Sequence, residues 1–309
     1  MKKWQALKPG DIIDVVAPGY SCSLQELENG VREIESWGFR VRFDKKILSP
    51  VSFHSNSDQE RFRQLKNALT NKQSKAVWCL RGGYGSNRLL PWLDQIEKPT
   101  QAKLFIGLSD ITSLHVFLNQ KWNWATIHGP LVDRIGKKLL SPEHKDEIIR
   151  LVMGQNIEVR LNGLQPMNKS ALKIKELNGK IIGGNLTVLQ SSLGTPYSVK
   201  LKNKFLFIED LGERGYRVDR MLEQLLQTGI LKQCLGILIG DFTGGDEPNG
   251  ENRVWEALDR FADLHTLPLW KGVQSGHGAI QRPLPLNVDA RLTRDGKLFE
   301  LIVQSGSKK

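Results

Sequence analysis

Ser109 stands where an apolar segment ends and a helical pattern begins, in the sequence FIGLSDITSLH of residues 105–115. A serine at such a strand-to-helix corner has its side chain at the positive end of the helix, where unpaired N–H groups can stabilise an oxyanion. The same corner is the N-cap position, which also favours serine. The nucleophile elbow GxSxG is only half matched, because Ile111 replaces its second glycine. Ser109 is therefore either a helix cap or an exposed nucleophile.

A nucleophilic serine needs a base, normally histidine, and the sequence has six histidines. His277 is the strongest candidate, because the loop VQSGHGAIQRP flanks it with glycines and has no apolar period that would bury it. His115 follows Ser109 on the same predicted helix, too far along to reach its hydroxyl. His128 ends a predicted strand and can approach the site, although a structural role suits it better. The other three lie in polar or helical contexts typical of surface residues: His54, His144 and His265.

A carboxylate must orient the base, and Glu209 is placed for that task. The apolar residues 205–208 lead directly to Glu209 and Asp210, at a predicted strand end. A carboxylate there is held by rigid backbone, as an orienting group requires. The alternative is a solvated acidic turn before the next helix. Glu213 and Asp219 are better explained by a helix N-terminus or by ion pairs with neighbouring arginines.

A glycine-rich loop follows another predicted strand, in the sequence LRGGYGSNRLL of residues 80–90. Gly82 and Gly83 allow backbone N–H groups to approach a ligand, as an oxyanion hole or a phosphate cradle requires. The loop is neither a Walker motif, because no GK[ST] follows, nor GxGxxG. A tight strand-to-helix turn would also explain its glycines. Arg81 adds a cation beside the loop.

Composition indicates a globular protein of two domains, since 309 residues exceed one ordinary core. Lysine and arginine exceed aspartate and glutamate by 44 − 33 = 11, which favours acidic ligands. These positive residues are scattered with no run of five or more, so no dedicated nucleic-acid surface is predicted.

Three widely spaced cysteines form no CxxC pair and no metal-ligand spacing, which predicts a reduced cytosolic compartment and no metal site. The first residues lack the apolar core of a signal peptide, and no apolar stretch approaches the roughly 18 residues of a membrane span. We therefore expect a soluble, cytoplasmic protein without a membrane partner.

The elements that must position these residues alternate between strand and helix in the first half. Strands are predicted at 12–17, 40–43, 76–80 and 103–106, and capping boxes at Ser23/Glu26 and Ser57/Glu60 each begin a helix. This order predicts a mostly parallel sheet covered by helices. Ligands of such sheets bind at the carboxyl ends of the strands, where the glycine-rich loop and Ser109 both lie.

The second half has a different character. Residues 160–172 are polar and interrupted by glycine and proline, so we interpret them as a linker between a domain of residues 1–160 and another of residues 171–309. Strands are predicted at 205–208 and 235–239, with a hairpin turning at Asp295-Gly296 and one amphipathic helix that stops at Gly229. These features predict a smaller, β-rich C-terminal domain.

Seven segments in this order together resemble the LD-carboxypeptidase family of serine peptidases. They run nearly end to end: GDIIDVVAPG, RGGYGSNRLLPWLD, FIGLSDITSLH, IHGP, GGNLTVLQSSLGTPY, FIEDLGERGYRVDRML and GVQSGHGAIQRPLPLN. Any single fragment would be weak evidence, but seven in order at plausible spacing are specific.

The resemblance implies a Ser-His-Glu triad. The family's nucleophile falls in G-x-S-D and matches Ser109, its glutamate matches Glu209, and its histidine in the G-H-G loop matches His277. The oxyanion hole would use the N–H of Asp110 and that of Gly82 or Gly83. Asp110 would then also cap the helix in place of the serine. Arg81 and Tyr84, on the glycine-rich loop, are the expected substrate-binding residues.

The resemblance also implies an N-terminal α/β domain, glutamine-amidotransferase-like or Rossmann-like, and a β-rich C-terminal domain, with the active site between them. Members of the family commonly form homodimers, use no cofactor, and typically act in the cytoplasm. They remove the terminal D-alanine from murein tetrapeptides during peptidoglycan recycling, by cleaving the bond between an L-configured centre and a D-residue. The expected partner is thus a muropeptide substrate.

Two other functions are open. Another branch of the family hydrolyses peptidyl- or aminoacyl-sulfamoyl adenylates and confers antibiotic immunity; it would need an aromatic platform for the base, for which Trp122 and Trp124 are candidates unless they belong to the core. A non-catalytic nucleotide or nucleic-acid binder could use the glycine-rich loop and basic residues. That second alternative leaves the coincidence of Ser109, Glu209 and His277 unexplained.

Overall fold

The N-terminal half forms a six-stranded sheet in the order β12-β6-β5-β4-β2-β3, in a computed structural model that describes residues 1–308. Five of its strands are parallel: β2 (Ile12–Val16), β3 (Arg40–Phe43), β4 (Ser74–Cys79), β5 (Leu104–Gly107) and β6 (Thr126–His128). The predicted parallel α/β sheet is therefore confirmed.

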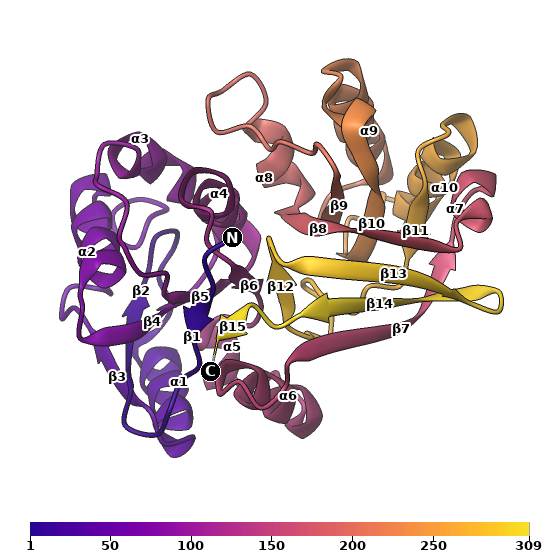
Figure 1. The fold of residues 1–309 in the computed structure, drawn as a ribbon. Coiled ribbons are helices and arrows are strands. Elements are labelled where there is room, and N and C mark those ends of the chain that lie inside the picture. The colour runs from indigo at the N-terminus through magenta and orange to yellow at the C-terminus, as the bar shows by residue number, and fades with distance from the viewer. Residues whose placement is uncertain (309) are drawn as a thin grey trace.

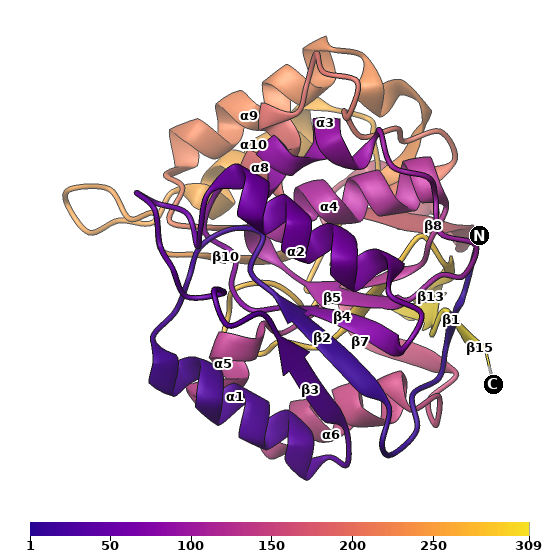
Figure 2. The same cartoon turned by 90° about the vertical axis from the view of Figure 1, so that its left-hand side faces the viewer.

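Helices cover both faces of this sheet (Figure 2). One face carries α1 (Leu24–Ser36), α5 (Val132–Gly136) and α6 (Pro142–Val152), and the other carries α2 (Asp58–Thr70), α3 (Leu90–Leu93) and α4 (Thr112–Phe117). Strand residues alternate between the two layers, because successive side chains point to opposite faces. Trp78 packs with the α1 side, whereas Val77 and Cys79 pack with the α2 side.

Local capping determines where the first helices begin. The Ser23 hydroxyl accepts from the Glu26 N–H at 3.2 Å, and the Glu26 carboxylate accepts from the Ser23 N–H at 2.9 Å, so this capping box is confirmed. Ser57 caps α2 by accepting from the Glu60 N–H at 3.3 Å. The second half of that predicted box is missing, because the Glu60 carboxylate binds Arg63 instead.

The C-terminal half is a closed barrel in the order β10-β11-β7-β14-β13-β8-β9 (Figure 1). Its strands are β7 (Glu158–Pro166), β8 (Glu176–Asn185), β9 (Lys204–Leu211), β10 (Cys234–Thr243), β11 (Leu269–Lys271), β13 (Asp289–Asp295) and β14 (Leu298–Gln304). Helices α8 (Leu186–Ser191), α9 (Gly215–Gln227) and α10 (Val254–Leu264) share a second apolar core with the outer faces of β9 and β10. The predicted β-rich domain and its hairpin at Asp295-Gly296 are confirmed.

The predicted linker at residues 160–172 is wrong. Most of it belongs to the barrel strand β7 and to the short helix α7 (Lys169–Lys173). Val159, Leu161 and Leu164 are buried, while the polar residues between them face outward. Gly163, with φ +80°, lies at the register shift between β7 and β14, where the alternation of buried and exposed residues is interrupted. The segment is polar because one side of the strand is exposed. The predicted first domain, residues 1–160, therefore ends inside β7.

Two strand pairings join the halves of the chain. β12 (Leu284–Leu286), which comes from the C-terminal half, pairs antiparallel with β6 at the edge of the N-terminal sheet. β1 (Trp4–Gln5) pairs in parallel with β15 (Ser307–Lys308), so the two ends of the chain lie together (Figure 1). These pairings attach each half of the chain to the other through backbone hydrogen bonds.

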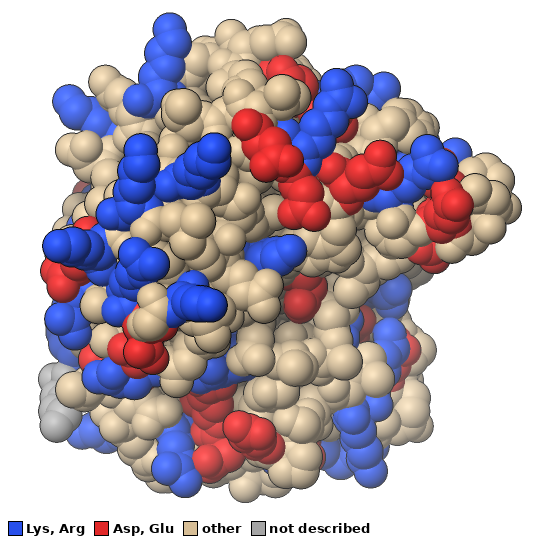
Figure 3. Space-filling model, turned by 90° about the vertical axis from the view of Figure 1, so that its right-hand side faces the viewer, with Lys and Arg blue, Asp and Glu red and all other residues tan. Residues whose placement is uncertain are grey.

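Charges are mixed over the surface. Figure 3 shows one face, on which lysine and arginine side chains are spread widely and interspersed with acidic groups. Within residues 1–308, no helix is both long and apolar enough to cross a bilayer.

Candidate active site

Ser109 occupies a tight corner after β5. The strand ends at Gly107, and the 3₁₀ turn η2 (Ser109–Ile111) leads into α4. Ser109 has φ +66°, a left-handed conformation that is uncommon for a residue with a side chain. The N-cap of this turn is Leu108, and no side chain caps it. Ser109 is therefore not a helix cap, and its backbone is in a strained conformation of the kind that occurs at functional sites.

The predicted cap role of Asp110 is also wrong. Its Oδ2 accepts from the Ser86 N–H at 2.8 Å, and the Ser86 hydroxyl donates to the Asp110 carbonyl at 2.5 Å. Burial raises the pKa of Asp110, against the effect of its bonds to Ser86. The side chain thus fastens the end of the glycine-rich loop to the serine corner. Arg61, which is fully buried, holds the same loop by donating to the carbonyls of Gly85, at 2.9 Å, and Pro18.

The glycine-rich loop lies directly against Ser109. A Cβ atom added to Gly82 would stand 2.7 Å from the Ser109 Cβ and 2.9 Å from its Oγ, closer than real Cβ contacts allow. The Gly82 carbonyl accepts from the Tyr20 N–H at 2.8 Å, and no hydrogen bond among the described residues uses the Gly82 N–H. Gly83, with φ +88°, faces Tyr20 instead. Gly82 is therefore the glycine that adjoins the serine.

Glu209 and His277 form a buried hydrogen-bonded pair. Glu209 lies on β9, and its Oε2 is 2.6 Å from the His277 Nδ1; their side chains are 0% and 7% exposed. Gly276 makes the approach possible, because any Cβ there would lie 3.1 Å from Oε2. Burial alone would raise the pKa of Glu209, but the charge and hydrogen bond of His277, together with the nearby His128 ring, lower it to about 2. Burial opposes the charged form of His277, yet Glu209 raises the pKa of that imidazole.

The serine corner and the acid–base pair come from different halves of the chain and meet through Asn185. The Asn185 N–H donates to Thr112 Oγ1 at 2.9 Å, one helical turn after Ser109. In the barrel, Asn185 is the register partner of Glu209 across β8 and β9. Within the described residues, no hydrogen bond joins the Ser109 hydroxyl to His277. The structure therefore brings Ser109, Glu209 and His277 to one region, without a hydrogen bond between the serine and the histidine.

Three further polar residues adjoin the pair without having been assigned to the site from the sequence. Asp241 accepts from the Gly278 N–H at 3.2 Å, and burial together with Glu209 raises its pKa to about 6. It follows the apolar residues 235–239, the same strand-end pattern that identified Glu209. Arg134 donates to the Gly278 carbonyl at 3.4 Å. His128, for which a structural role was predicted, lies on the other side of Glu209, with its Nε2 3.8 Å from Oε1.

His115 has a structural role. Its Nε2 contacts the Gly107 carbonyl at 2.8 Å and its Nδ1 contacts Thr126 Oγ1 at 2.9 Å. Burial lowers its pKa to about 3, so the ring is neutral near neutral pH.

Arg81 and Tyr84 lie at the outer side of the glycine-rich loop. The Arg81 Nε is 3.9 Å from an Asp133 carboxylate oxygen, and 37% of its side chain is exposed. Tyr84, 46% exposed, adjoins the rings of His54 and Phe53 with centroids 5.4 and 5.8 Å away. Both residues are free to contact a ligand that enters beside Gly82.

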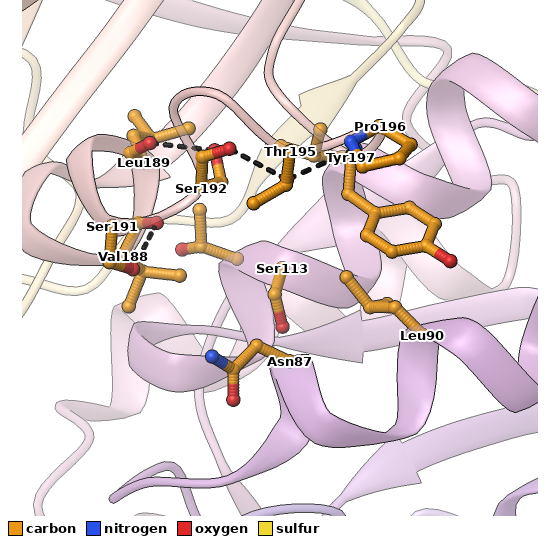
Figure 4. Close-up of a pocket in the computed structure, with 12 residues that line it drawn as sticks. Asn87, Leu90, Ser113, Val188, Leu189, Ser191, Ser192, Thr195, Pro196 and Tyr197 are labelled. Carbon is orange, nitrogen blue, oxygen red and sulfur yellow. Dashed lines mark hydrogen bonds between the residues drawn. The ribbon is translucent and has the colours of Figure 1, made fainter.

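An apolar pocket of about 340 Å³ lies between the two halves (Figure 4). Asn87, Leu90 and Ser113 line it from one side, and α8 with the loop through Tyr197 lines it from the other. None of Ser109, Glu209 and His277 is among its lining residues. Trp122 and Trp124 do not supply an aromatic platform, because they are only 4% and 0% exposed and belong to the core.

Comparison with known proteins gives two family matches. Residues 13–129 match the LD-carboxypeptidase N-terminal domain, and residues 178–292 match the LD-carboxypeptidase C-terminal domain. The two matched segments contain Ser109, Glu209 and His277.

Individual relatives span nearly the whole chain. A Bacillus subtilis protein named "probable murein peptide carboxypeptidase" is 30% identical and covers 99% of this chain and 97% of its own. The crystal structure of muramoyltetrapeptide carboxypeptidase from Oxalobacter formigenes superposes with a TM-score of 0.83 at 27% identity, over 95% of this chain and 98% of that one. The microcin C7 self-immunity protein MccF of Escherichia coli is 24% identical, over 93% of this chain and 91% of its own.

Proposed function

The chain belongs to the LD-carboxypeptidase family of serine-type peptidases, and from this premise we propose that it releases the terminal D-alanine from murein tetrapeptides with Ser109, His277 and Glu209 as its catalytic triad. The observation that carries the proposal is the buried 2.6 Å contact between His277 and Glu209, in the same region as a serine held at φ +66°. A buried imidazole–carboxylate pair in the same region as a serine at a strand-to-helix corner suits acyl transfer.

The proposed reaction has two halves. The His277 Nε2 removes the proton from the Ser109 hydroxyl as its oxygen attacks the scissile carbonyl, and then gives that proton to the amine of the departing D-alanine. Water attacks the resulting acyl-enzyme ester by the same route and restores the serine. Glu209 holds Nδ1–H throughout, which keeps the lone pair of Nε2 directed outward and stabilises the imidazolium.

The developing oxyanion is proposed to bind the N–H groups of Gly82 and Asp110. Gly82 is favoured over Gly83 because it packs against Ser109, whereas Gly83 faces Tyr20. The Gly82 N–H also has no partner among the described residues. The Asp110 N–H follows the nucleophile in the chain, at the start of the helix, where the helix dipole also favours negative charge.

Arg81 and Tyr84 are proposed to bind the substrate. A carboxypeptidase must recognise a free carboxylate, and Arg81 is a partly exposed guanidinium one residue from Gly82. The formal net charge of +11 also suits a peptide that carries several carboxylates. The enzyme is further proposed to be a cytoplasmic homodimer. Light scattering on the purified protein would test the dimer, and cell fractionation would test the location.

The deciding experiment compares the unmodified enzyme with Ser109→Ala on a murein tetrapeptide. The variant should lose measurable D-alanine release while keeping its circular dichroism spectrum and melting temperature. Alanine release by the variant at a rate similar to the unmodified enzyme would rule out Ser109 as the nucleophile.

A second candidate is the hydrolysis of aminoacyl-sulfamoyl adenylates, favoured by the similarity to MccF. The expected platform of Trp122 and Trp124 is buried, so a base would have to stack elsewhere, on the exposed rings of Phe53 and Tyr84. Assays of both substrate classes with one enzyme preparation separate the two functions. The proposed function requires the higher kcat/KM for the tetrapeptide.

A further inference from the structure

Glu209 lies between two imidazoles. His277 contacts its Oε2, while the Nε2 of His128, at the end of β6, is 3.8 Å from its Oε1. The side chains of His128 and Glu209 are both 0% exposed. Among the described residues, neither His128 Nε2 nor Glu209 Oε1 has a hydrogen-bond partner. Two unpaired buried polar atoms therefore lie close to each other across the junction of the two halves.

The other contacts of His128 determine which of its nitrogens carries the proton. An ionised carboxylate only accepts hydrogen bonds, so the nitrogen directed at Glu209 must be the donor. Nδ1 is then the acceptor, and the Ser275 hydroxyl, 3.2 Å away, can donate to it. Ser275 precedes His277 by two residues in the same loop. The ring is kept in this orientation by edge-to-face packing on Phe207, with centroids 5.1 Å apart.

We propose that His128 is a positioning residue that donates a hydrogen bond from Nε2 to Glu209 Oε1. The N-terminal half thereby holds the carboxylate of the triad, and Ser275 links the same imidazole ring to the loop of His277. This proposal rests on the proposed triad. The gap from 3.8 Å to a hydrogen bond is less than about 1 Å, which a small approach of the two halves would close. Glu209 Oε1 is buried without a hydrogen-bond partner among the described residues, which is energetically unfavourable and so favours that approach.

The hydrogen bond has a consequence for the base. A donor at Oε1 withdraws negative charge from the carboxylate and so limits how strongly Glu209 stabilises the His277 imidazolium. Removal of that donor should make His277 more basic. Other ionisable groups around the pair are Asp210 on β9, Asp241 on β10, Arg134 on α5 and His115 on α4. Substitution of His128 leaves all four groups unchanged, so they do not alter the comparison between the unmodified enzyme and the His128 variants.

The test replaces His128 in two ways. His128→Phe keeps a ring but removes the donor, whereas His128→Gln keeps an amide N–H near the position of Nε2. We expect His128→Phe to lower kcat by about 10- to 100-fold, the size of a lost hydrogen bond to a charged group. We also expect it to move the acid limb of kcat/KM to higher pH. His128→Gln should restore most of the rate and the original limb.

His115→Gln is the matched control. His115 is equally buried and its ring lies 6.3 Å from that of His128, but it bonds to Gly107 and Thr126 rather than to Glu209. This variant should leave the acid limb in place. A loss of rate in His128→Phe with an unmoved limb, or an equal shift in His115→Gln, would overturn the positioning role.

A measurement without substrate separates this proposal from the proposed function. Histidine-selective NMR of the unmodified enzyme should show His128 with its proton on Nε2, and in His128→Phe the His277 ring should titrate at higher pH. A proton on His128 Nδ1 instead would overturn the proposal even if every variant folded poorly. Failure of the tetrapeptide assay alone, with both NMR results as expected, would count against the substrate and leave the His128–Glu209 contact supported.

Discussion

Gly82 and Ser109 are packed so closely that a Cβ atom added to Gly82 would stand 2.7 Å from the Cβ of Ser109. The two residues come from loops that follow neighbouring strands, β4 and β5, at the carboxyl edge of the sheet. A backbone N–H this close to the serine is placed to stabilise the oxyanion of a tetrahedral intermediate formed on Ser109. The contact therefore explains why a glycine is needed there on geometric grounds.

Gly82→Ala should lower kcat by about 100-fold, comparable to the loss of one oxyanion donor, because the methyl group must displace the Ser109 side chain or the loop. Gly82 does not have a positive φ, so alanine adds no backbone strain of its own. The measurement is steady-state kinetics together with thermal melting. A folded variant with an unchanged kcat would show that the glycine-rich loop takes no part in the reaction.

Glu209→Gln should lower kcat by roughly 10⁴-fold, because an amide N–H facing His277 Nδ1 favours the tautomer with its proton on Nε2, which cannot act as a base. Asp210→Asn is the matched control, since Asp210 is a buried acid on the same strand that binds Asn185 and Thr187 rather than His277. Turnover should fall far more in the first variant than in the second. Similar losses in both would indicate damage to β9 instead of a catalytic role for Glu209.

The pH dependence of kcat/KM should have an acid limb above pH 6.5, the ordinary value for histidine, because Glu209 raises the pKa of His277 against the effect of burial. The base acts only when neutral, so activity rises as pH increases through that raised pKa. Glu209, with a pKa of about 2, stays ionised throughout this range. A limb at or below pH 6.5 would contradict the pairing as the source of basicity.

Arg81→Gln should raise KM for the tetrapeptide by roughly 10- to 100-fold with a smaller change in kcat, as expected when a charged hydrogen bond to a carboxylate is lost. Arg88→Gln is the control, because Arg88 is an exposed arginine nearby in the chain that already binds Asp58 at 2.6 Å. An amidated peptide should bind the unmodified enzyme as weakly as the free acid binds the Arg81 variant. Unchanged KM for Arg81→Gln would assign the carboxylate to another cation.

Much of the fold could be predicted because it depends on residues close together in the chain. The Ser23 capping box, the strand at residues 40–43 and the hairpin at Asp295-Gly296 each follow from a few neighbouring side chains. The same local logic placed Ser109 just after a strand and Glu209 near the end of another, although β9 continues to Leu211. Asp241 has the same kind of signal near the end of β10. The catalytic roles of Ser109, Glu209 and His277 stay predictions until the variants are measured.

Periodicity and capping act within a few residues, so the α/β order of the first half, the strand-rich second half and the residue types available for acyl transfer could be predicted from the sequence. Three features could not be predicted in this way: 158–166 is a barrel strand, β12 joins the other half's sheet, and His128 faces Glu209. These features depend on which distant strands pair and which buried polar atoms then lack partners. Ser109 shows both levels: its position was evident from the pattern, but its left-handed φ and its contact with Gly82 arise from packing.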